Sequence, residues 1–170
     1  MDFVHAIGMA DTFWPLSTIV SRLLVAVIFG GIIGFEREAS AHSAGLRTHI
    51  LVLLAAALDT ILTLEIFHLP EVMTQDRSDP VHAVEAVTAG IAFLGAGAIF
   101  RRGDGPRGLT TGAGMWLAGA LGMTAGLGYY VIGLVVAVLG VLILMAAKLL
   151  DRRIDHAAER GGPPHDGPAS

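Results

Sequence analysis

The sequence contains no cysteine, few aromatic residues and little charge. Only 15% of its 170 residues are charged and 6% are aromatic, whereas soluble domains average about 25% charged residues. The absence of cysteine excludes disulfides, thiolate metal sites and thiol nucleophiles. The sequence also lacks the GxxxxGK[ST] phosphate loop, the HExxH zinc motif and any nucleophile–base arrangement. We therefore expect no enzymatic activity, no cofactor and no nucleic-acid partner, and the ligands of any metal ion stay unassigned.

Hydrophobic residues and glycine are abundant instead. The chain is 54% hydrophobic with a mean hydropathy of +0.67, and it has 22 glycines. Apolar runs of about 20 residues are typical of transmembrane helices, and glycine allows such helices to pack closely. The sequence thus predicts an all-α integral membrane protein, folded as a compact bundle of five transmembrane helices. The expected spans are about 16–35, 48–67, 84–100, 109–127 and 128–147, with a Gly-rich turn between the last two.

The positions of the polar residues indicate the boundaries of the membrane domain and its orientation in the membrane. Residues 1–15 contain no Lys or Arg, so we interpret them as an interfacial N-terminal segment and not as a signal peptide. Residues 16–150 form the expected membrane domain, and 151–170 a polar cytoplasmic tail that ends in disorder. With the N-terminus outside, nine of the 11 basic residues lie on the cytoplasmic side. The positive-inside rule therefore predicts an N-out, C-in, multi-pass membrane protein.

Two charges fall deep inside the expected spans. Arg22 lies about seven residues from the outer end of the first span, and Asp59 about eight residues from the outer end of the second. At 1.5 Å per residue both lie about 10–12 Å below the surface. Because an unpaired charge at that depth is costly, we predict an Arg22–Asp59 ion pair. The pair is either structural or part of a cation or proton path.

The first cytoplasmic connection is unusually rich in charge. The stretch from Gly34 to His49 reads "GFEREASAHSAGLRTH". Its arginines, Arg37 and Arg47, either only fix the topology or belong to a tightly turned loop packed on the bundle. In the second case we expect Glu36 to pair with Arg107.

Glycines recur at helical spacing. Gly30 and Gly34, Gly108 and Gly112, and Gly122 and Gly126 each follow the GxxxG pattern of close helix contacts. The third span adds the run "TAGIAFLGAGAIF", which contains Gly95 and Gly97. The following "RRGDGPRGLTT" places arginines before Thr110 and Thr111 at a helix start, where either an anion or only topology-setting charge is expected.

Three strings in this order closely resemble the MgtC/SapB family: "GGIIGFERE", "AGLRTHILVLLAAA" and "GIAFLGAGAIFRR…PRGLTTGAGMWLAGALG". The resemblance extends from about residue 23 to residue 127. It implies a five-helix module of the bacterial inner membrane that is linked to magnesium homeostasis. The family-like candidate functional residues are Glu36, Arg37, Arg47, Thr48, Gly95, Gly97, Arg107, Thr110, Thr111 and Trp116. Asp59 lies outside the family's familiar pattern, and the polar end is similar to the short, SapB-like type without a soluble C-terminal domain.

The resemblance implies two alternative functions. In the first, the protein supports magnesium homeostasis by regulating or contacting another membrane complex, such as an F-type ATP synthase. In the second, it is a small carrier or channel for Mg²⁺ or another cation, acting as an oligomer and using Asp59 and Glu36. The expected partners are therefore the lipid bilayer, a membrane protein complex or a second copy of the chain, and Mg²⁺.

Overall fold

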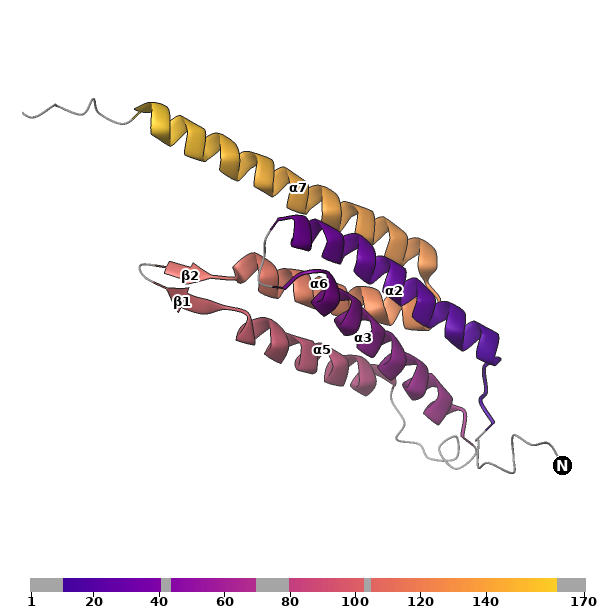
Figure 1. The fold of residues 1–170 in the computed structure, drawn as a ribbon. Coiled ribbons are helices and arrows are strands. Elements are labelled where there is room, and N and C mark those ends of the chain that lie inside the picture. Colours follow the sequence, from indigo (N-terminus) through magenta and orange to yellow (C-terminus); the bar gives the residue numbers. More distant parts are fainter. Residues whose placement is uncertain (1–10, 41–43, 70–79, 103–104, 162–170) are drawn as a thin grey trace, which may run out of the picture.

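The computed structural model describes residues 11–40, 44–69, 80–102 and 105–161. Within them the chain forms five helices and one short hairpin of strands (Figure 1). The elements are α2 (Leu16–Ala39), α3 (Leu46–Phe67), α5 (Pro80–Gly97), β1 (Phe100–Arg102), β2 (Gly105–Arg107), α6 (Leu109–Leu127) and α7 (Tyr130–Gly161). The two strands are antiparallel, with Phe100 opposite Arg107.

The predicted five helices are present, and three are long and apolar enough to cross a membrane. These three are Leu16–Ala39, Leu46–Phe67 and Tyr130–Leu150, while the apolar part of α5 is shorter, Val81–Gly97. The third predicted span, 84–100, was wrong at both ends. The helix begins at Pro80, a residue suited to a first helical position, and it ends at Gly97, where the chain turns into the hairpin.

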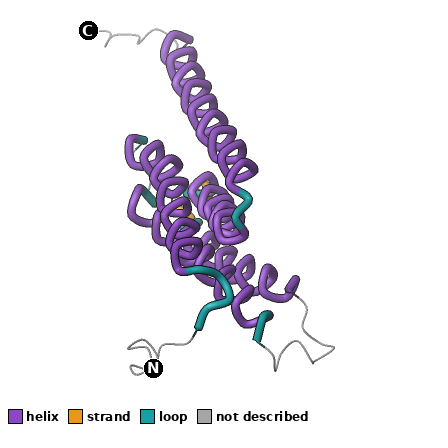
Figure 2. The backbone as a smooth tube through the Cα atoms, turned by 90° about the vertical axis from the view of Figure 1, so that its right-hand side faces the viewer, coloured by secondary structure: helices purple, strands orange, loops and turns teal. Residues whose placement is uncertain are grey.

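Helix α3 lies between its neighbours and packs on α2, α5 and α6. Helix α5 covers α3 and α6, whereas α7 lies on the opposite side of the bundle against α2 and α6 (Figure 1). Helix α7 continues to Gly161, past the ends of the other helices, so residues 151–161 of the predicted polar tail are helical (Figure 2). Residues 162–170, where we predicted disorder, lie outside the described residues.

Glycines bring the backbones of α2, α3 and α6 into contact, as their spacing predicted. A Cβ atom added at Gly30 would lie 2.7 Å from Ile50 Cα, and one at Gly34 would lie 2.8 Å from Leu46 Cα. On the other side of α3, an added Cβ at Gly122 would lie 2.5 Å from the Leu53 carbonyl oxygen. No side chain fits at such distances, so these helices pack backbone to backbone.

The predicted tight turn between the last two helices is also present. Gly128 has a φ of +83°, and its N–H donates to the Ala125 carbonyl at 3.0 Å. The N–H of Tyr129 donates to the Thr124 carbonyl at 2.8 Å, which completes a Schellman motif. The left-handed conformation at this position favours glycine, so α7 turns back at once against α6.

Replacement of Gly122 by alanine should destabilise the bundle by about 1–3 kcal/mol, because the added methyl group overlaps the α3 backbone. Gly31→Ala is the matched control, since an added Cβ there meets nothing within 4 Å. That control should be neutral or stabilising by up to about 1 kcal/mol. Thermal unfolding in detergent measures both. Equal melting temperatures for the two variants would contradict backbone contact between α3 and α6.

Candidate functional site

A buried ion pair lies where α2 approaches its C-terminus. The Arg37 side chain is 2% exposed and its Nε donates to Glu36 Oε2 at 2.7 Å. Both residues belong to the charged loop of the sequence prediction, but they lie inside the helix and face the bundle. A buried charge needs a partner of opposite sign, and each supplies one to the other. This pair was predicted as a family-like motif, whereas its burial was not predicted.

The ion pair extends through hydrogen bonds to α7. Ser40 Oγ donates to Glu36 Oε1 at 2.8 Å, and Lys148 Nζ donates to Ser40 Oγ at 3.0 Å. Four polar side chains thus form a chain from α2 to α7. Sequence reasoning missed Ser40 and Lys148 because they lie 108 positions apart and share no motif.

Glu38 has a different role from Glu36, as their spacing of two residues on a helix suggested. Its Oε2 accepts the N–H of Leu46, the first residue of α3, at 3.0 Å. A carboxylate at this position stabilises the positive end of the helix dipole. Gly45 precedes α3 directly, and an added Cβ there would collide with the Glu38 carboxylate. The "AGLR" turn is therefore packed on α2, as predicted, while Arg47 is exposed.

His49 is a buried polar residue that the sequence analysis passed over. It is fully buried on α3, and its Nδ1 lies 2.9 Å from the Gly45 carbonyl oxygen. Because a carbonyl only accepts, Nδ1 carries the proton. The other ring nitrogen faces α6, 3.5 Å from a Cβ added at Gly114. The signal that marks it is a histidine inside an apolar span, a rare and costly position.

The predicted contact between Glu36 and Arg107 is not formed. Arg107, at the end of β2, is exposed, and Glu36 instead bonds Arg37 and Ser40. The adjacent arginine reaches the carboxylate without leaving its helix. Of the two threonines at the start of α6, Thr110 is exposed and Thr111 is buried. The predicted anion site also drew on Arg101 and Arg102, whose side chains lie outside the described part.

Arg22 lies at the opposite end of the bundle, where it hydrogen-bonds to α6. Its side chain is 7% exposed, and Nη1 donates to the Gly126 carbonyl at 2.9 Å. The guanidinium also lies over the Trp14 ring, 4.5 Å from its centroid. Gly126 belongs to the last turn of α6, whose carbonyls have no partner within the helix. Arg22 therefore caps α6, which a cation at a helix C-terminus does favourably.

The structure does not form the predicted Arg22–Asp59 pair. Arg22 faces α6, whereas Asp59 lies on the part of α3 that faces α5 and is exposed. Position along a helix predicts the depth of a residue, but the side to which it points depends on how the helices are rotated against each other. The two residues match in depth and differ in direction.

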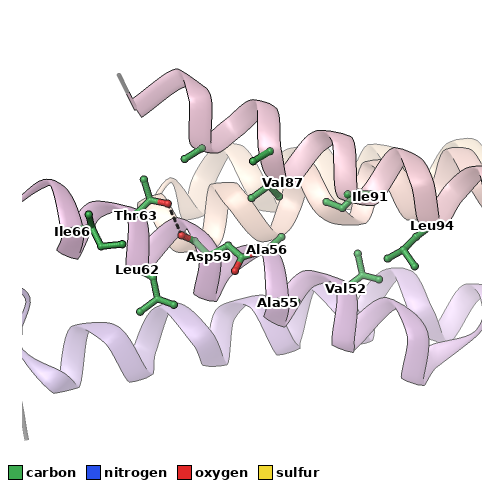
Figure 3. A pocket seen from close by; sticks show the side chains of 13 residues that line it. Val52, Ala55, Ala56, Asp59, Leu62, Thr63, Ile66, Val87, Ile91 and Leu94 are labelled. Atoms are coloured by element: carbon green, nitrogen blue, oxygen red, sulfur yellow. Dashed lines mark hydrogen bonds between the residues drawn. The ribbon is translucent and has the colours of Figure 1, made fainter. Parts of the chain in front are cut away.

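Asp59 instead lines a groove between α3 and α5, which we call the α3–α5 groove (Figure 3). Its volume is about 630 Å³, and its lining comprises Val52, Ala55, Ala56, Asp59, Leu62, Thr63, Ile66, Ala83, Ala86, Val87, Gly90, Ile91 and Leu94. Thr63 Oγ1 donates to the backbone carbonyl of Asp59 at 2.7 Å, so this hydroxyl satisfies the helix. Among the described residues, no three His, Asp or Glu side chains gather as a metal site.

The remaining predicted residues are dispersed. Gly95 packs on Gly112, where an added Cβ would lie 3.2 Å from the carbonyl oxygen. Gly97 has no neighbour within 4 Å of an added Cβ, and Thr48 is half-buried near the start of α3. Trp116 is 53% exposed and lines a smaller cavity of about 200 Å³. The structure thus brings Glu36 and Arg37 together and leaves the other predicted residues apart.

Comparison with known proteins supplies the family context. The sequence profile of the MgtC family matches residues 23–153. The chain is 37% identical over 137 residues to the Escherichia coli K12 protein named "Putative magnesium transporter YhiD", covering 79% of this chain and 63% of that protein.

Two further relatives carry the name MgtC. The chain is 37% identical over 114 residues to Protein MgtC of Brucella abortus, with 67% of this chain and 44% of the relative covered. It is 36% identical over 141 residues to Protein MgtC of Salmonella typhimurium, with coverage of 83% and 54%. The chain therefore spans about half to two thirds of the length of these relatives. No solved structure matches it.

Removal of the Arg37 cation should destabilise the protein by about 3–5 kcal/mol, because Arg37→Met leaves the Glu36 carboxylate buried without its cation. Adding Glu36→Gln to Arg37→Met should restore part of that loss. Arg47→Met is the control, since Arg47 is exposed and surface changes stay within about 0.5 kcal/mol. Unfolding in detergent measures all of them. Equal losses for Arg37→Met and Arg47→Met would contradict the buried pair.

Arg22→Met should cost about 1–3 kcal/mol, because the Gly126 carbonyl loses its donor. Asp59→Asn should not lower the unfolding free energy, since the carboxylate is exposed and forms no ion pair among the described residues. Comparable losses in both variants would instead indicate the ion pair that the sequence suggested. Melting temperatures of the two single variants and the double variant decide between these outcomes.

Proposed function

The chain belongs to the MgtC family, and from this premise we propose that it is an inner-membrane protein that supports magnesium homeostasis by contacting and regulating another membrane complex. The protein crosses the membrane five times, N-out and C-in. It works without enzymatic chemistry, and a respiratory complex such as an ATP synthase is one partner of the expected kind. The link to magnesium rests on the family and on the name that the Escherichia coli relative carries.

The observation that carries this proposal is the direction of the family-like charges. Glu36 and Arg37 point inward, and their hydrogen bonds join α2 to its own loop and to α7. Charges used in this way hold a scaffold together. The features that face outward are the apolar sides of the helices, the α3–α5 groove and, among the family-like charges, Arg47 and Arg107. These surfaces suit contact with lipid and with a partner.

The distribution of basic residues supports the orientation. Arg47 and Arg107 lie at the end of the bundle that also holds the Glu36–Arg37 pair, because each is next to a turn at that end. Lys148 lies within α7 and donates to Ser40 at the same end. The positive-inside rule places this end in the cytoplasm. Glu65 lies at the other end, where its carboxylate accepts the N–H groups of Phe13 and Trp14 at 2.7 and 3.1 Å.

Asp59 favours a second candidate function, transport of Mg²⁺ or another cation. It is a carboxylate in a groove at membrane depth, a position that marks ion pathways in many membrane proteins. One carboxylate suffices for Mg²⁺ when the ion keeps several of its waters.

Purified protein in liposomes should pass no more Mg²⁺ than empty liposomes do, while deletion of its gene should slow growth of the host bacterium in low magnesium. The reason is that a regulator acts through its partner, which the liposomes lack. A magnesium-sensitive dye reports the flux, with folding checked by the melting temperature. Saturable flux that Asp59→Asn abolishes and Glu38→Gln retains would replace this proposal by the carrier.

A further inference from the structure

Two features of the α3–α5 groove are not explained by contacts among the described residues. The first is Gly90, where an added Cβ would meet nothing within 4 Å. Glycine weakens a helix by up to about 1 kcal/mol relative to alanine, so it is costly without a close neighbour. Gly95, Gly112 and Gly122 each have such a neighbour on another helix, whereas Gly31, Gly90 and Gly97 have none among the described residues, and of these three only Gly90 lines the groove. Gly90 lines the groove instead, together with Ala86 one turn before it.

The second feature is the charge of Asp59. It lies eight residues before Phe67, the end of α3, which corresponds to about 12 Å along the helix. None of the ion pairs among the described residues involves it. A carboxylate at this depth and open to lipid is costly, so its stable state requires a cation beside it.

A transmembrane helix from another protein would explain both Gly90 and Asp59. Ala55 and Asp59 on α3, and Ala86 and Gly90 on α5, are each four residues apart and line the same groove (Figure 3 shows the α3 side). Small residues at this spacing let a further helix approach closely. A Lys or Arg on that helix would bring the cation to the depth of Asp59, whereas a lipid tail carries no charge and a lipid headgroup stays at the surface.

Among the described residues, no basic side chain of a second copy is placed to supply that cation. All copies share one orientation in the membrane, so the cation must lie at the depth of Asp59. Arg22 has that depth but is buried against Gly126 and Trp14. Arg47 lies at the opposite end of α3, and Lys148 donates to Ser40. Charge complementarity therefore points to a different protein.

We propose that the α3–α5 groove is the seat for a transmembrane helix of a partner protein, whose Lys or Arg pairs with Asp59. The proposal rests on the partner-contacting function above and names the surface and the chemistry of that contact. It makes Gly90 the position of closest approach and Asp59 the residue that selects the partner.

Synthetic transmembrane peptides test the groove directly. The probe is a 22-residue Leu/Ala helix, the length of α3, with one lysine eight residues from its end. The matched peptide has glutamine at that position. Energy transfer between labelled protein and peptide in liposomes gives the dissociation constants. The lysine peptide should bind about tenfold tighter than the glutamine peptide, equivalent to about 1.4 kcal/mol.

Three variants locate the binding. Asp59→Asn should remove the tenfold preference for lysine, and Gly90→Leu should abolish binding of both peptides by filling the groove. Gly31→Leu should bind like the parent, because its side chain also enters open space but on α2. Equal binding of the two peptides, or binding to Gly90→Leu as tight as to the parent, would overturn the proposal.

Two other outcomes would assign a different occupant to the groove. Association between labelled copies of the protein that Gly90→Leu abolishes, without competition by the lysine peptide, would make a second copy the occupant. Absence of any association would leave lipid as the occupant and would also overturn the proposal. Neither result affects the growth and flux measurements. Failure of the groove proposal is therefore distinguishable from failure of the proposed regulatory function.

Discussion

The close approach of three helix backbones determines the rest of the structure. Lipid provides no hydrophobic force between helices, so their association depends on packing and interhelical hydrogen bonds. Here α3 lies against α2 through Gly30 and Gly34, and against α6 through Gly122 and Gly126. These contacts leave little room for side chains between the three axes. As a result α5 and α7 are placed on the outside, and each keeps one face open.

Because the three central helices are so close, any polar group between them must be satisfied within the bundle. Arg37 pairs with Glu36, His49 bonds the Gly45 carbonyl, and Arg22 bonds the Gly126 carbonyl. The first two bonds are local to α2 and to the start of α3, whereas the Arg22 bond joins α2 to the end of α6 and so restricts how these two helices are rotated against each other. This explains why a chain with so little charge has charged residues at its most buried positions.

The sequence predicted the helices well and the side-chain partners poorly, for one physical reason. Apolar run length determines where a membrane helix can lie, and GxxxG spacing marks its close contacts, as at Gly122. The partner of a charge depends instead on helix rotation, which no local pattern encodes. Arg22 and Asp59 have equal depth and yet face different helices. The hairpin after Gly97 was missed because its strands are only three residues long and the apolar run of the preceding helix continues without a break to Phe100, the first residue of β1.

The charges of Glu36 and Arg37 in the family-like strings contribute to the stability of the bundle, whereas the charge of Asp59 does not. Glu36 and Arg37 bond within α2, so their presence is explained by the stability of the bundle. Asp59 lies outside those strings, and neither stability nor helix capping explains it. Gly90 is unexplained by internal packing in the same way, and both residues line one groove. A fold tolerates one costly residue for many reasons, but two costly residues of different kind on the same surface indicate a common cause outside the chain. The proposed partner helix would supply that cause, with a close contact at Gly90 and a cation beside Asp59.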